Sequence, residues 1–186
     1  MSLTGSTLVW VTSSDMAFLR ILLLFALSAT AWAADQEAEI SRFLGESFVQ
    51  PPAAETLWLI GDLQPAVRAI LGHDYPAARI RYWRVGQRTA WVLDEIGKEM
   101  PITIGIVIGN GAVESVKVLV YRESRGWEVK SPAFTAQFSG AKLTTDQQLD
   151  RHIDGISGAT LSVRALGRLT RLALLLDRHV TTGDKP

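Results

Sequence analysis

The sequence predicts an α+β domain in which an antiparallel β-meander of hairpins lies between N-terminal helices and a C-terminal helix. Near both ends of the chain, apolar residues recur three and four positions apart, which is the spacing of amphipathic helices. Between these ends, apolar residues alternate with a period of two, which is the spacing of strands. Helices that precede and follow a run of antiparallel strands are typical of the α+β class.

The composition favours one globular domain and excludes several kinds of site. Nineteen basic residues balance 19 acidic ones, so the chain lacks the basic excess of a general nucleic-acid-binding protein. The absence of cysteine excludes disulfides, cysteine-bound zinc, iron–sulfur clusters, covalent c-type haem and a thiol nucleophile. Only three histidines are present, and they are widely separated. We therefore expect no nucleic-acid partner and no metal site.

Residues 1–33 have the pattern of an export signal. Arg20 precedes a short apolar core, and Ala31-Trp-Ala33 follows as an A-x-A cleavage site. A permanent anchor needs about 20 apolar residues, and this core is shorter. We therefore expect a cleaved signal peptide and a periplasmic or otherwise extracytoplasmic protein, with an uncleaved inner-membrane anchor as the alternative. Residues 1–15 carry no basic side chain and precede Met16, so we interpret them as an extension upstream of the true start.

Two helices are predicted next, within an N-terminal helical segment at residues 34–75. Apolar residues at helical spacing among Glu, Gln and Arg predict an amphipathic helix over residues 35–48, which ends before Pro51-Pro52. A second helical pattern covers residues 55–71, on both sides of Gly61. Gly72 supplies a C-terminal stop for this helix.

The following residues predict two hairpins. Residues 79–85 and 89–93 flank Gly86-Gln87, which favours a tight turn between two strands. Isoleucine occupies every second position over residues 102–108 and predicts one face of a strand. Asn110-Gly111 follows and is the strongest hairpin signal in the chain, because type I′ turns need positive φ at both central positions. On the return strand, one face is expected to carry Val116, Val118 and Val120.

The remaining chain predicts a long loop and a final helix, which complete a domain at residues 76–180. Residues 124–149 are loop-rich. Apolar residues then recur at helical spacing from Leu161 to Leu176, and residues 181–186 form a tail. Four arginines of this helix are expected to point outward, namely Arg164, Arg168, Arg171 and Arg178.

The segment Asp154-Gly-Ile-Ser-Gly-Ala-Thr160 leads directly into this helix. Unpaired backbone N–H groups and the positive end of the helix dipole make such a loop an anion site. Gly158 and Ala159 allow close approach of the backbone, and Thr160 presents a hydroxyl at the first turn. The alternative is that Ser157 is only an N-cap and the glycines set the turn.

The pattern Asp154-x-x-Ser157-Gly-Ala-Thr160 resembles the flavinylation motif of the FMN-binding domain family. This domain occurs in the C subunit of the sodium-pumping NADH:quinone reductase and in the G subunit of Rnf complexes. The resemblance covers roughly residues 79–176, since the upstream hairpin, residues 122–129 and 134–138, Gly140, Ile153 and Leu161-Ser162 also match in order.

The resemblance implies FMN that is joined through its phosphate to the hydroxyl of Thr160 by a flavin transferase that consumes FAD. Asp154 and Ser157 match motif positions and are expected to serve the transferase or the phosphate. Trp127 and Phe134, with Phe138, are candidates to stack on the isoalloxazine ring, and core or loop packing is the alternative. Two charged residues, Glu123 and Arg125, either contact the flavin or pair with each other.

The resemblance also implies a function, namely relay of electrons between a membrane-associated donor and another acceptor by an exported flavoprotein with covalent FMN. The family's subunits keep their N-terminal helix as an anchor, whereas the segment here has a cleavage site, which favours a free or loosely associated flavoprotein. A flavin-dependent reductase of a small extracytoplasmic acceptor is one alternative. A non-catalytic redox-sensing or binding module is another.

Overall fold

The computed structural model describes residues 34–183, so the predicted signal peptide and the last residues of the tail lie outside the described part. The described residues from Glu39 to Gly183 belong to one compact unit. Within the described residues, no helix combines the length and the apolar character that crossing a membrane requires.

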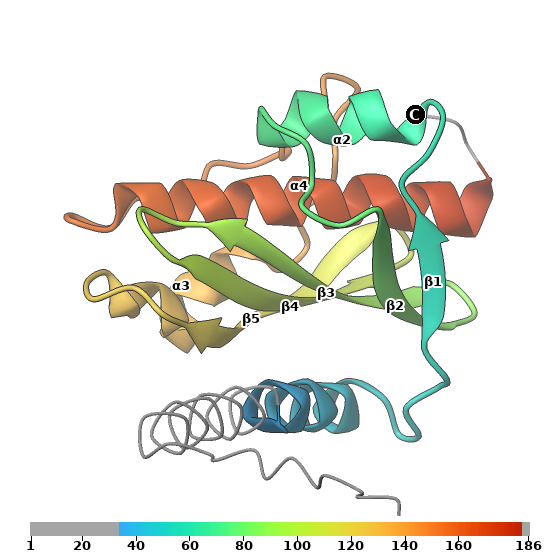
Figure 1. Cartoon of the computed structure of the whole chain (residues 1–186), viewed down its shortest axis with the longest axis horizontal. Helices are drawn as coiled ribbons and strands as arrows, with labels where there is room; N and C mark the ends of the chain where they lie inside the picture. The colour runs from blue at the N-terminus through green and yellow to red at the C-terminus, as the bar shows by residue number, and fades with distance from the viewer. Residues whose placement is uncertain (1–33, 184–186) are drawn as a thin grey trace, which may run out of the picture. The chain divides into compact units, whose positions relative to one another are not determined.

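A five-stranded antiparallel sheet organises this unit, and its strands lie side by side in sequence order (Figure 1). The strands are β1 (Glu55–Trp58), β2 (Arg79–Val85), β3 (Arg88–Ile96), β4 (Pro101–Gly109) and β5 (Ala112–Tyr121). The sheet and the C-terminal helix α4 (Thr160–Thr182) confirm the predicted α+β class and the meander. Asn110 and Gly111 join β4 to β5 with φ values of 52° and 73°, so both are positive as a type I′ turn requires.

Helices cover one face of the sheet in two layers. Figure 1 shows α4 lying along the sheet and α2 (Leu63–Leu71) lying on the outer side of α4, and both helices contact each other. The main core forms between α4 and the sheet, where the isoleucines at 102, 104, 106 and 108 are fully buried. Gly72 ends α2 in the left-handed conformation, as predicted.

A smaller core lies on the opposite face of the sheet. The helix over residues 34–47 confirms the predicted amphipathic helix, and its apolar face packs against alternate positions of the strands. The buried members are Ile40, Phe43, Leu44, Phe48, Trp83, Ala90, Val107 and Leu119.

Two predictions about local structure were wrong. Residues 55–58 form the edge strand β1 instead of a helix, with Thr56 opposite Arg81 on β2. Val120 packs with the smaller core, whereas Val116 and Val118 belong to the main core. The register shifts between Thr103 and Ile104, where Val118 and Val120 face successive residues of β4. This β-bulge reverses the side on which Val120 emerges.

The outward orientation predicted for the arginines of α4 is also only partly right. Arg168 donates to the buried Glu95 on β3, and Arg171 donates to the backbone oxygen of Ile70 at the end of α2. Both are half-buried because α4 lies between the sheet and α2. Leu161 in the first turn of α4, which was predicted to belong to the apolar face, is instead 44% exposed.

Candidate functional site

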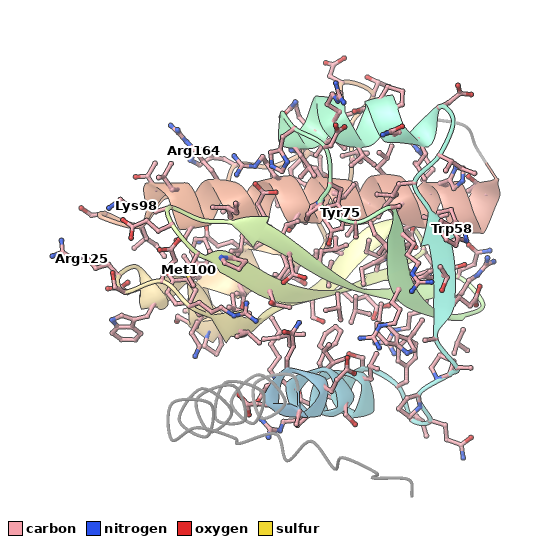
Figure 2. The ribbon with its side chains drawn as sticks, viewed as in Figure 1. Trp58, Tyr75, Lys98, Met100, Arg125 and Arg164 are labelled. Carbon is pink, nitrogen blue, oxygen red and sulfur yellow. The ribbon has the colours of Figure 1, made fainter. Side chains whose placement is uncertain are left out.

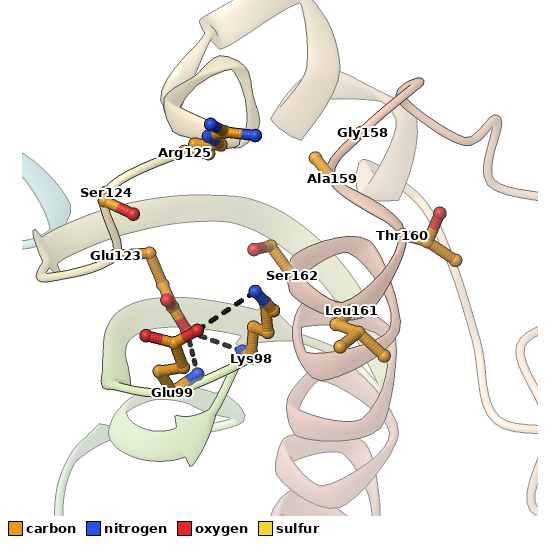
Figure 3. A pocket seen from close by; sticks show the side chains of 10 residues that line it. All are labelled: Lys98, Glu99, Glu123, Ser124, Arg125, Gly158, Ala159, Thr160, Leu161 and Ser162. Atoms are coloured by element: carbon orange, nitrogen blue, oxygen red, sulfur yellow. Dashed lines mark hydrogen bonds and ion pairs between the residues drawn. The ribbon is translucent and has the colours of Figure 1, made fainter.

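Three segments meet at the N-terminal end of α4 and enclose an open pocket of about 540 Å³ (Figure 3). They are the turn after β3, the loop after β5, and the end of the motif with the first turn of α4. Sites for small molecules commonly have volumes of about 300–1,000 Å³. The lining residues are Lys98, Glu99, Glu123, Ser124, Arg125, Gly158, Ala159, Thr160, Leu161 and Ser162.

Glu123 lies in the loop after β5 and binds the backbone of the turn after β3. Its Oε1 accepts hydrogen bonds from the backbone N–H groups of Lys98 at 2.5 Å, Glu99 at 2.8 Å and Met100 at 3.0 Å. Desolvation raises the pKa of the Glu123 carboxyl, but these N–H groups outweigh it and the net pKa is lowered. Glu123 is therefore held as a carboxylate. The ion pair between Glu123 and Arg125 that the sequence suggested does not form in the described structure.

Tyr121 and Gly126 hold the loop after β5 against the motif. The hydroxyl of Tyr121 donates to the backbone oxygen of Arg125 at 2.5 Å and lies 3.1 Å from Oγ of Ser162 in α4. Gly126 has a φ of 82°, and a Cβ there would lie 2.9 Å from Cβ of Ala159. The loop therefore needs a glycine at this position for its backbone conformation and for its contact.

The N-terminus of α4 keeps its backbone donors free of side-chain caps. Ala159 is the N-cap residue, and no side chain caps the helix. The N–H of Ala159 donates to Ile156 at 3.0 Å, and its carbonyl accepts from Val163 at 3.0 Å. Val163 is the first residue whose N–H donates to a carbonyl of this helix. The N–H groups of residues 160–162 therefore have no helical acceptor and are available to an anion. The alternative in which Ser157 serves as the N-cap is wrong.

The pocket brings together five of the residues that the sequence proposed for cofactor binding. They are Glu123, Arg125, Gly158, Ala159 and Thr160. In Figure 3, Ala159 and Ser162 point toward the side of Glu123, whereas Thr160 points away from it at the rim. Thr160 is exposed, and none of the described residues hydrogen-bonds its hydroxyl.

Four other proposed residues do not line this pocket. Asp154 is exposed, and its backbone N–H donates to Oε1 of Gln137 at 2.8 Å. Ser157 is exposed in the motif loop. Trp127 is 67% exposed, whereas Phe134 is buried in the main core with its ring edge-on to Phe138. A role of these four residues toward the cofactor or the transferase stays a prediction.

Sequence reasoning missed the contribution of the turn after β3. Lys98 and Glu99 carry no motif, and they reach the pocket only because Glu123 binds the backbone of their turn. A charged Gly-Lys-Glu turn between two strands is an ordinary solvated turn when it is considered alone. Only its place beside the motif gives it a role.

The segment that forms the pocket matches a known protein family. Residues 97–175 match the model of the FMN-binding domain. This segment is therefore similar to the FMN-binding domain, and the match supports that family for this part of the chain. The matched segment begins at the turn after β3 and ends within α4, so it contains every residue that lines the pocket. No curated protein matches the chain.

The pocket of this FMN-binding domain fits its cofactor. Its anion donors are the free N–H groups in the first turn of α4, and the side chain of Arg125 adds positive charge at one wall, whereas Lys98 is paired with Glu99 at 3.0 Å. The side chain of Arg125 has no hydrogen-bond or ion-pair partner among the described residues. The protein is thus a flavoprotein, and FMN is its cofactor.

Proposed function

We propose that this protein is an exported electron-transfer flavoprotein that carries FMN covalently on Thr160. It relays electrons between a membrane-associated donor and another acceptor. FMN, when bound, supplies the one- and two-electron redox chemistry, and the protein supplies position and electrostatics.

The observation that carries this proposal is the exposed hydroxyl of Thr160 at the start of α4. This hydroxyl caps no helix and is unengaged within residues 34–183, although it stands beside the free N–H groups of the first turn. A hydroxyl that served only the fold would be expected to hydrogen-bond one of these groups. Its position instead suits a group that is modified from solvent.

The attachment follows from the chemistry of the hydroxyl and of FAD. Oγ1 of Thr160 forms a bond to the phosphorus on the FMN side of the pyrophosphate, the P–O bond to the adenylate breaks, and AMP leaves. The hydroxyl proton is released, so no oxidant or reductant is consumed. The new phosphodiester carries one negative charge, which the N-terminus of α4 stabilises through its N–H groups and its dipole.

The pocket residues have separate tasks in this proposal. Glu123 and Tyr121 fix the two loops that form the walls opposite α4. Arg125 attracts the anionic part of the cofactor from one of these walls. The tether to Thr160 keeps FMN at a high effective concentration, because a dissociated cofactor would be diluted outside the cytoplasm. The cleaved signal at Ala33 completes the proposal and predicts a mature N-terminus at Ala34.

The test is the intact mass of protein co-expressed with an FAD-dependent flavin transferase. Wild type should begin at Ala34, carry the added mass of one FMN phosphodiester, and stay fluorescent on a denaturing gel. Thr160→Ala should fold and show no covalent flavin, whereas Thr160→Ser should keep at least partial modification. Ser162→Ala is the matched control, because this neighbouring hydroxyl points to the other side of the helix (Figure 3).

Two results would contradict the proposal. Covalent flavin in the Thr160→Ala variant would move the attachment to another residue. Unmodified wild type in the presence of an active transferase would leave FMN as a non-covalent cofactor.

A further inference from the structure

The side of α4 that carries Thr160 also carries a line of arginines. Arg164, Arg168 and Arg171 follow Thr160 at intervals of four, eight and eleven residues, which place them on one side of a helix with 3.6 residues per turn. Figure 2 shows Arg164 projecting from the N-terminal part of α4. Arg151 of the preceding loop joins the three, and a groove of about 390 Å³ lies between them. We call these four residues the arginine groove.

The arginine groove has more positive charge than its neighbours neutralise. Arg168 pairs with Glu95 at 2.8 Å, and Arg151 lies 3.4 Å from Asp150. Arg171 donates to neutral oxygens only, those of Ile70 at 3.1 Å, Gln147 at 3.4 Å and Gln148 at 2.8 Å. Arg164 is exposed and has no ion pair within the described part of the chain. Two cations therefore remain without a carboxylate, in a protein whose net charge is zero.

Most of these guanidinium groups are also held in place. Arg151 donates to the backbone oxygen of Ser139 at 2.5 Å, and Arg171 bridges the end of α2 and the loop at residue 147. Fixed guanidinium groups lose little side-chain entropy on binding, and the free planar fork of the neighbouring Arg164 matches the two oxygens of a carboxylate. The surface is therefore prepared for carboxylates that approach from solvent.

We propose that the arginine groove is the docking surface for an acidic patch of the flavin transferase, an inference that rests on the flavinylation of Thr160. A protein that modifies the Thr160 hydroxyl must approach the exposed side of the first turn of α4. The same side continues along the helix to Arg164 and, two turns further, to Arg171. A transferase whose acidic side chains bind there places its active site over Thr160. Complementary charges of this kind increase the rate of encounter and fix the orientation of the complex.

The test measures binding apart from modification. The apo Thr160→Ala protein accepts no flavin, so its Kd for the transferase purified from the native host reports docking alone. Adding Arg164→Glu should raise this Kd at least about tenfold at low salt and make it less dependent on salt. The matched control is Arg79→Glu, which changes the net charge equally. Arg79 is exposed on β2 and lies over the ring of Trp58. Figure 2 shows Trp58 on the opposite side of the molecule from Arg164.

The outcomes separate this inference from the proposed function. Equal Kd values for the Arg164→Glu and Arg79→Glu variants would overturn the docking surface while leaving covalent FMN on Thr160 intact. A transferase that binds the arginine groove but never modifies wild type would overturn the flavinylation and support the docking. Restored binding when Arg164→Glu is combined with a Glu→Lys change in the transferase's acidic patch would identify the paired residues. Retention of inorganic phosphate by the groove without any effect of Arg164→Glu on transferase binding would assign the groove to a small anion instead.

Discussion

Gly126 and Ala159 are in direct contact, and the contact joins two walls of the pocket at the start of α4. A Cβ on Gly126 would lie 2.9 Å from Cβ of Ala159 and 2.9 Å from the hydroxyl of Tyr121. Ala159 is the residue immediately before α4, so the loop after β5 rests directly on the start of the helix. The position of the helix N-terminus therefore depends on a residue with no side chain.

Gly126→Ala should destabilise the protein more than Gly72→Ala, which is its matched control. Both glycines have φ above 80°, where an added Cβ costs about 1–2 kcal/mol. At Gly72 nothing lies within 4 Å of that Cβ, whereas at Gly126 the overpacking adds about 1–3 kcal/mol. Urea unfolding measures the difference, and the affinity of the Thr160→Ala form for free FMN should fall only in Gly126→Ala. Equal losses of stability would mean that the loop moves aside freely.

Ser157→Ala should change the free energy of unfolding by less than about 0.5 kcal/mol. An N-cap serine typically contributes about 1 kcal/mol, but Ser157 lies before the N-cap position and caps nothing. Thermal unfolding of both proteins without cofactor measures the change. A loss of 1 kcal/mol or more would restore the capping role. Unchanged stability together with slower flavinylation would assign Ser157 to recognition of the motif.

The elements that the sequence predicted correctly are determined by residues that are close together in the sequence. Positive φ at Asn110 and Gly111 follows from the type of turn that these two residues form. The alternating isoleucines of β4 define one apolar side of the strand, which is buried whichever element packs against it. The same holds for Gly72, whose left-handed conformation ends α2. Such features are encoded within a few residues.

The errors arose where a distant partner decides the structure. Residues 55–58 are too few for a period to distinguish helix from strand, and they become a strand by pairing with residues 79–82 of β2. The side on which Val120 lies is decided by a bulge against Thr103 and Ile104, which no pattern within β5 indicates.

The candidate site also combines residues that the local sequence indicated with residues that only the fold brings to it. The motif indicated Thr160 and an anion-binding helix N-terminus, because both belong to one continuous segment. The turn with Lys98 and Glu99 lies about 60 residues earlier in the chain and is recruited by Glu123. Its place depends on the meander, since the pairing of β4 with β5 brings Glu123 next to that turn.

Glu123→Gln should destabilise the protein at neutral pH and make it less sensitive to acid. Its pKa is lowered below the ordinary value of 4.5, so the ionised group stabilises the fold above that pH. The contribution is lost as the pH falls through the lowered pKa. Chemical unfolding at pH 7, 5 and 3 should therefore show a gap between wild type and Glu123→Gln that closes at the lowest pH. Glu99→Gln is the control, because the exposed Glu99 pairs only with Lys98. A constant gap would mean that the carboxylate charge has no part in holding the turn.

Stability should fall as the pH rises from 6.5 through the raised pKa of His73, because of a cluster around the buried Glu95. Oε1 of Glu95 lies 3.0 Å from Nε2 of His73 and 2.8 Å from Nη2 of Arg168, so it joins the loop after α2 to β3 and α4. The hydrogen bond to Glu95 is the main cause that raises the pKa of His73 above its ordinary value of 6.5. A raised pKa contributes stability that is full below pH 6.5 and is lost as the pH rises through the raised value.

His73→Asn should therefore flatten the change of unfolding free energy between pH 6 and pH 9, because it removes the group that titrates. His152→Asn is the matched control, since His152 is 87% exposed and its nearest acidic oxygen, on Asp154, lies 3.7 Å away. Arg168 still pairs with Glu95 in His73→Asn, so the buried carboxylate keeps one partner and the variant should fold. A profile that keeps its slope in His73→Asn would place the titrating group outside this cluster, whereas loss of the slope in His152→Asn would place it beside the flavinylation motif.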